Sequence, residues 1–127
     1  MALVQQEGKM AAEKNFENKI KAILKRYGCW YVKYWGGGKF TKDGVPDLII
    51  CCNGRFVGCE VKAENGTATE IQKHTLNKIY ISGGYAVLLY PKDFEAFTLL
   101  IDALSAEPVN DKAADDIYRK HFERKGW

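Results

Sequence analysis

A two-residue turn signal between two apolar runs constrains this chain more than any other feature. In the segment 45–63, V-P-D-L-I-I-C-C-N-G-R-F-V-G-C-E-V-K-A, the dipeptide Asn53-Gly54 separates two strand-like stretches. Both residues tolerate the positive φ of a type I′ turn, so the segment predicts a β-hairpin. A two-residue turn also determines the register, because paired positions must then add up to 107. Asp47 is therefore expected opposite Glu60.

This register predicts a cluster of three charged side chains at one end of an otherwise apolar hairpin. Directly opposed residues of an antiparallel pair have Cβ atoms roughly 4.5–5.5 Å apart, and like charges placed there repel each other. Lys62 lies two residues beyond Glu60, so its side chain projects from the same face as the two acids. A shared divalent cation would relieve the repulsion, and hard carboxylate oxygens suit Mg²⁺ or Mn²⁺.

An alternative is that these charges form a solvated strand edge, of the kind that protects sheets against aggregation. Both faces of the hairpin are apolar, however: Leu48, Ile50, Val57, Cys59 and Val61 on one face, and Ile49, Cys51, Phe56 and Gly58 on the other. Two-sided hydrophobicity is typical of strands in the centre of a sheet. A charged cluster at the end of central strands favours a functional site.

The composition excludes several classes of protein. A chain of 127 residues with 46% hydrophobic residues is large enough for one core and too apolar to be disordered. Its longest apolar runs fall far short of the roughly 18 residues of a membrane span. The first 14 residues lack the pattern of a secretory signal, and the four cysteines lack zinc-site spacing. We therefore expect reduced thiols and a cytoplasmic location.

The net charge of +3 says little, but the basic residues are concentrated in the first third and at the end of the chain. They are Lys14, Lys19, Lys21, Lys25, Arg26, Lys33, Lys39, Lys42, Arg119, Lys120, Arg124 and Lys125. Such clusters can follow a nucleic-acid backbone, and an ordinary solvated helix surface is an equal alternative.

The segment before the hairpin contains a helix and a strand. Apolar residues at helical spacing predict a helix over 11–27, and Gly28 provides its stop signal. Aromatic and β-branched residues predict a strand over 29–35. The glycine-rich loop over 36–44 is not a phosphate-binding P-loop, because Phe40 stands where that motif needs Ser or Thr.

The segment after the hairpin begins with a helix from about residue 69. Thr67 and Glu70 have the spacing of a capping box at its start. A short apolar strand over 85–90 and a further helix follow. A separate basic, aromatic helix over 111–125 ends the chain.

This element order, together with a few short motifs, resembles the PD-(D/E)XK nuclease superfamily. The motifs are Pro46-Asp47, Glu60-Val61-Lys62 and the downstream Gln72. More closely, G-V-P-D-L-I and N-G-R-F-V-G-C-E-V-K, followed by Gln72, look like the virus-type replication-repair nuclease (VRR-Nuc) domain, over residues 16–90. The joint order of these motifs is more specific than any one of them.

The resemblance implies an α/β protein with a restriction-endonuclease-like core. Its elements would follow the order αβββαβ, with a central mixed sheet flanked by helices and an extra C-terminal helix. We expect a single nuclease domain over 1–127, with its core at about 11–104 and the basic C-terminal helix at about 111–125.

The resemblance also implies the residues of the site. The catalytic residues would be Glu17, Asp47, Glu60, Lys62 and Gln72. The metal ligands would be Asp47, Glu60, Glu17 and the carbonyl of Val61, holding Mg²⁺ or Mn²⁺. A metal-activated water would then hydrolyse the phosphodiester bond, with Lys62 near the developing negative charge. No protein nucleophile is required.

Small members of this family resemble structure-selective DNA endonucleases that act on branched DNA. We therefore expect a homodimer, of phage or mobile-element origin, that cuts four-way junctions in the bacterial host cytoplasm. One alternative is a DNA nickase or exonuclease without branch preference. Another is a non-catalytic DNA-binding module of the same fold, which would bind DNA without cleaving it in manganese. A purely structural protein is a third alternative.

Overall fold

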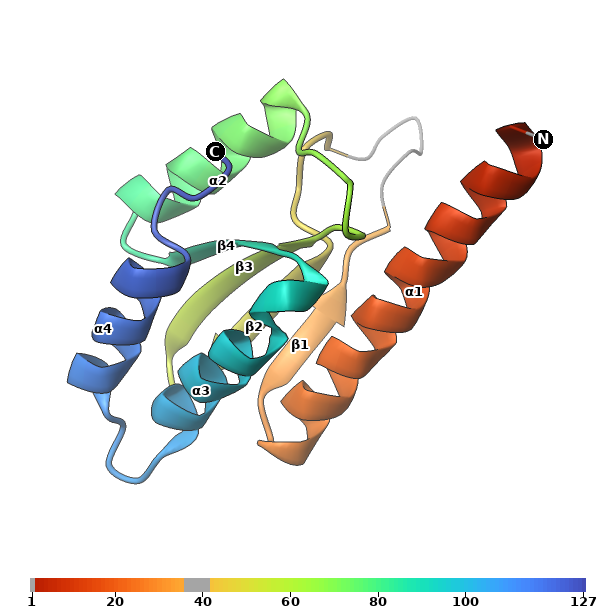
Figure 1. Ribbon diagram of the computed structural model, residues 1–127. Helices are drawn as coiled ribbons and strands as arrows, with labels where there is room; N and C mark the ends of the chain where they lie inside the picture. Colours follow the sequence, from red (N-terminus) through yellow and green to blue (C-terminus); the bar gives the residue numbers. More distant parts are fainter. Residues whose placement is uncertain (1, 36–41) are drawn as a thin grey trace.

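The protein is an α/β structure whose elements follow the expected order. The computed structural model describes residues 2–35 and 42–127, so the expected glycine-rich loop lies mostly outside the described residues. The elements are α1 (Ala2–Arg26), β1 (Trp30–Lys33), β2 (Leu48–Cys52), β3 (Arg55–Val61), α2 (Glu70–Ile81), β4 (Tyr85–Leu89), the 3₁₀ turn η1 (Pro91–Asp93), α3 (Phe94–Ser105) and α4 (Asp111–His121). This arrangement confirms the predicted fold class (Figure 1).

The four strands form one mixed sheet in the order β1-β2-β3-β4. The hairpin register is confirmed, because Ile50 pairs with Val57 across the turn. Asn53 and Gly54 have φ values of 49° and 84°, in the left-handed region that a type I′ turn requires. Strands β3 and β4 run parallel through α2, so β2 and β3 are the central strands, as predicted.

Helices cover both faces of the sheet, and this gives the three layers visible in Figure 1. Helices α1, α3 and α4 pack on one face through a large core, while α2 packs on the other face through a smaller core. The residues of the hairpin in the large core are those expected on one face: Leu48, Ile50, Val57, Cys59 and Val61, with Cys52. The alternation of side chains along the strands therefore decides which face each helix covers.

The C-terminal helix packs into the large core and does not stand apart from it. Ala114, Tyr118 and Phe122 are buried there. The guanidinium of Arg55, at the start of β3, binds the carboxylate of Asp111 at the start of α4, with Nε 2.9 Å from Oδ1. The helix ends at His121 and not at 125, because the backbone of the buried Phe122 leaves the helical region at φ −128°.

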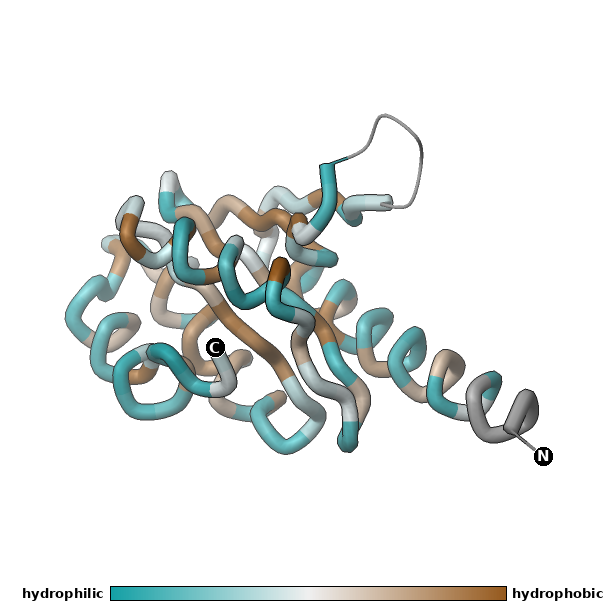
Figure 2. Tube along the Cα trace, turned by 90° about the horizontal axis from the view of Figure 1, so that it is seen from above, coloured by the Kyte–Doolittle hydropathy of each residue, from teal (hydrophilic) through white to brown (hydrophobic). Residues whose placement is uncertain are grey.

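Two other helix boundaries differ from the prediction. Helix α1 begins at Ala2 and not near residue 11, so its first turns extend beyond the sheet (Figure 2). The N-cap of α2 is Thr69, whose side chain accepts from Gln72, and not Thr67 with Glu70. The sequence T-A-T-E-I-Q contains the capping-box spacing twice, and only the tertiary position of the helix selects between them.

No helix in residues 2–35 and 42–127 has the length and apolarity needed to cross a bilayer. All four cysteines are free.

Candidate active site

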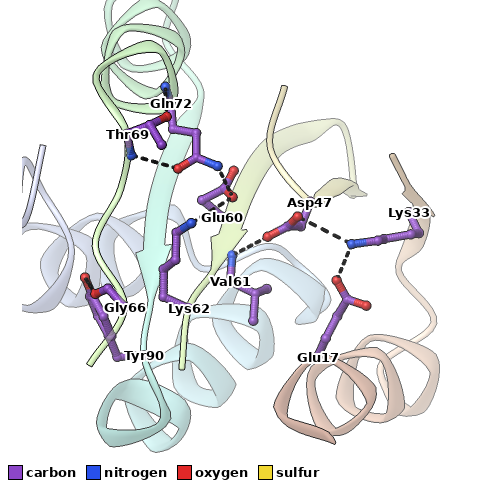
Figure 3. A network of polar contacts seen from close by, with 10 residues as sticks. All are labelled: Glu17, Lys33, Asp47, Glu60, Val61, Lys62, Gly66, Thr69, Gln72 and Tyr90. Carbon is purple, nitrogen blue, oxygen red and sulfur yellow. Dashed lines mark hydrogen bonds and ion pairs between the residues drawn. The ribbon is translucent and has the colours of Figure 1, made fainter. Parts of the chain in front are cut away.

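The two acids of the hairpin lie side by side where β2 begins and β3 ends. Glu60, on β3, is only 2% exposed, and its Oε2 has no hydrogen-bond partner among the described residues. Asp47 directly precedes β2, and its Oδ2 accepts a hydrogen bond from the backbone N–H of Val61 at 2.9 Å. This bond holds the Asp47 carboxylate against the end of β3, beside Glu60 (Figure 3). The sequence-derived juxtaposition of residues 47 and 60 is therefore present.

The acid pair changes the proton affinity of Glu60. Burial, followed by the neighbouring Asp47 carboxylate, raises the pKa of Glu60 from 4.5 to about 8. Lys62 offsets part of this shift, since its Nζ lies 3.8 Å from Glu60 Oε1. Two carboxylates in one buried site resist simultaneous ionisation, and a cation between them would remove that penalty.

Glu17 of α1 completes the cluster from the helix side. It is 8% exposed, and its Oε1 accepts a hydrogen bond from Lys33 Nζ at 2.6 Å. The same ammonium lies 3.4 Å from Asp47 Oδ1, so Lys33 bridges the two acids. Burial alone would lower the pKa of Lys33, but the Glu17 and Asp47 carboxylates outweigh it and raise that pKa. Lys21, one turn along α1, lies 3.5 Å from Glu17 Oε2.

Gln72 connects the start of α2 to the acid pair. Its Nε2 donates to Glu60 Oε1 at 2.9 Å, while its Oε1 accepts from the backbone N–H of Thr69 at 2.9 Å. Thr69 Oγ1 in turn accepts from the Gln72 N–H at 3.3 Å. The capping box therefore fixes the amide side chain in the orientation that donates to Glu60 (Figure 3).

All five predicted catalytic side chains thus lie in one contact network. Lys33 also belongs to it, and Glu13 interacts with it electrostatically. Lys33 was expected only as one of the clustered basic residues and not as a partner of the acids. Its position at the end of β1, opposite Leu48 of β2, is the signal that could have placed it there. Glu13 lies one turn before Glu17 on α1. Burial raises the pKa of Glu13; Lys62 opposes this shift and Asp47 adds to it. The spacing of four residues from Glu17 is the signal that could have identified Glu13.

The residues present fit a divalent metal ion. Glu60 Oε2 is a buried carboxylate oxygen without a partner among the described residues, and Asp47 and Glu17 add further hard oxygen donors. Within the described residues, no three His, Cys, Asp or Glu side chains form a ready metal cluster. The physical reason lies in the side-chain pairing: the Lys33 ammonium stands between Glu17 and Asp47, and the other oxygen of Asp47 accepts from Val61 N–H.

The comparisons with known proteins agree with this arrangement. The family model of archaeal Holliday junction resolvases (Hjc) matches residues 9–96, the stretch that contains the whole acid cluster. That family is a member of the PD-(D/E)XK nuclease superfamily, which confirms the broader resemblance of the motifs. Comparisons with curated proteins and with solved structures gave no match. Because the match covers more than half of the sequence, the chain belongs to the archaeal Holliday junction resolvase family.

Proposed function

We propose that the protein is a metal-dependent DNA endonuclease that cleaves four-way junctions and related branched DNA. The observation that carries this proposal is the buried acid pair with the unpartnered oxygen of Glu60, flanked by Lys62. Membership of the Hjc family supports the choice of a junction as substrate. Mg²⁺ or Mn²⁺ is the proposed cofactor, because the donors are carboxylates.

The metal, when bound, supplies a water of lowered pKa and stabilises charge on the phosphoryl and leaving oxygens. Asp47, Glu60, Glu17 and the carbonyl of Val61 are its proposed ligands. Gln72 orients Glu60 through the 2.9 Å hydrogen bond to Oε1. Lys62, held at the edge of the acid pair, orients the attacking water and balances negative charge as it develops on the phosphate. No protein nucleophile takes part.

A homodimer is the proposed assembly, and an exposed apolar sheet face supports it. Helix α2 covers the β4 side of its face, and it leaves apolar side chains of β1, β2 and β3 uncovered. Trp30 is 62% exposed, and its pairing partner Cys51 and the next residue across, Phe56, are exposed as well. A contiguous apolar patch of this kind is typical of an interface, and two copies would cut two strands symmetrically.

Four finer proposals rest on the sequence motifs and the packing. The virus-type motifs support a relation to VRR-Nuc domains and a phage origin. The proposed DNA substrate supports action in the cytoplasm. The packing of α4 into the large core supports a single nuclease domain over residues 1–127.

The test is a cleavage assay on a labelled four-way junction, a linear duplex of matched sequence and a supercoiled plasmid, in Mn²⁺, Mg²⁺ or chelator. We expect paired cuts in the junction with metal and none in chelator. Lys62→Met should lower the rate about 10²- to 10³-fold, in line with the loss of one electrostatic stabiliser. Glu60→Gln should abolish cleavage, whereas Glu64→Gln, an exposed acid in the following loop, should not.

The same assay separates the alternatives. Equal cutting of junction and linear duplex would favour a nickase or exonuclease without branch preference. DNA binding without cleavage in either metal would favour a non-catalytic module. For the assembly, Phe56→Lys should convert a dimer into a monomer in analytical ultracentrifugation, and a monomeric wild-type protein would contradict the dimer.

A further inference from the structure

A groove lies between the middle of α1 and the end of β1, beside the acid cluster. Its volume is about 470 Å³, within the range of roughly 300–1,000 Å³ that is typical of ligand sites. Glu17 and Lys33 line this groove and also belong to the acid cluster, so the groove opens directly onto the proposed site of cleavage. A strand whose phosphate reaches the acids would pass through it.

Cationic side chains outnumber acidic ones in the groove. The cations are Lys9, Lys14, Lys21 and Lys33, and the acids are Glu13 and Glu17. Lys21 and Lys33 are paired with Glu17, whereas Lys9 and Lys14 are exposed and form no ion pair with any described residue. Ammonium groups in a groove attract a nucleic-acid backbone and release its counterions.

An exposed aromatic ring lies at the mouth of the groove. Trp35 lies two residues beyond the end of β1 and is 75% exposed. The Lys33 ammonium lies 5.3 Å from the centroid of its ring. Large exposed indole surface beside cations is the combination with which proteins bind single-stranded nucleic acid, through base stacking and phosphate contacts.

We propose that this groove binds an unpaired nucleotide next to the bond that is cleaved, with its base stacked on Trp35 and its phosphate against Lys14. The proposal deepens the proposed function and rests on it for the location of cleavage. In a continuous duplex both faces of a base are covered by its neighbours, so no face is open to an indole. A strand that is splayed at a branch exposes such a face. The groove would therefore contribute directly to the preference for branched DNA.

The test measures DNA affinity in chelator, where no cleavage is expected, by fluorescence anisotropy of a short labelled single strand and of its duplex. Trp35→Ala should weaken single-strand binding about 5- to 150-fold and leave duplex binding unchanged, because one stacked base is lost. Trp35→Phe should retain most of the affinity. Ile81→Ala, which removes an exposed apolar side chain at the end of α2, outside both the groove and the proposed dimer surface, is the control.

An unchanged ratio of single-strand to duplex affinity in Trp35→Ala would overturn the proposal, as would an equal loss in Ile81→Ala. Lys14→Ala should weaken the binding of both DNAs and reduce the salt slope for the single strand by about 0.7, as expected for one phosphate contact. If Trp35→Ala weakens single-strand binding but the wild-type protein cleaves no DNA in Mn²⁺, the groove proposal is supported and the nuclease proposal is refuted. Junction cleavage by Trp35→Ala with wild-type kcat/KM and wild-type single-strand affinity would refute the groove alone.

Discussion

Replacing Glu60 by Gln is expected to stabilise the metal-free protein at alkaline pH. Burial and the Asp47 carboxylate raise the pKa of Glu60 from 4.5 to about 8, so the folded state favours the protonated acid. An acid with a raised pKa contributes stability that is fully present below pH 4.5 and is lost as the pH rises through 8. Within this window, each rise of one pH unit lowers the folding equilibrium constant up to tenfold. Between pH 5 and pH 9, the free energy of unfolding of the wild type should therefore fall by on the order of 4 kcal/mol relative to Glu60→Gln.

The assay is urea unfolding in chelator at several pH values between 5 and 9, which yields the free energy of unfolding at each. The neutral amide of Glu60→Gln cannot ionise, so its advantage over wild type should grow as the pH rises. The exposed acid Glu64 provides the matched control, and Glu64→Gln should follow the wild-type curve. If the difference between wild type and Glu60→Gln stays constant across this range, the acid pair does not resist ionisation, and the electrostatic argument for a metal is refuted.

Three further substitutions test single contacts. Lys33→Met removes the ammonium between two carboxylates, so Mn²⁺ binding measured by calorimetry should become tighter than in wild type, and weaker binding would contradict this pairing. Gln72→Ala removes one half of the capping box at the start of α2 and should lower the free energy of unfolding in urea by about 1 kcal/mol. An unchanged free energy of unfolding would mean that the capping box does not stabilise the protein. Tyr118→Phe deletes a buried hydroxyl that accepts a hydrogen bond from the Ala86 N–H and donates one to the Ala86 carbonyl. This loss should lower the free energy of unfolding by about 1–3 kcal/mol in the same assay. An unchanged urea midpoint would contradict the prediction.

The hairpin and the acid pair could be predicted because they depend on local geometry. Asn53-Gly54 closes a turn of defined length, and the side-chain period of two along a strand then determines which residues share a face. Ile50 consequently pairs with Val57, and Asp47 meets Glu60. No contact distant in sequence is needed for this step.

The partners of the acids could not be predicted in the same way. Lys33 reaches Glu17 only because α1 packs across the sheet, and Gln72 donates to Glu60 only because α2 starts at one of two equivalent capping signals. Periodicity also predicted α1 from its buried stripe alone, and so missed the turns before residue 11, of which residues 7–10 are exposed.

Local sequence therefore determined the order of the elements, the register of the central hairpin and the meeting of two carboxylates, because turn chemistry and strand alternation act over a few residues. The tertiary structure decided how strongly Glu60 is buried, which cation bridges Asp47 and Glu17, and that the groove at Trp35 opens beside them. These features depend on how helices pack against the sheet, and packing sums many weak contacts between residues far apart in the chain.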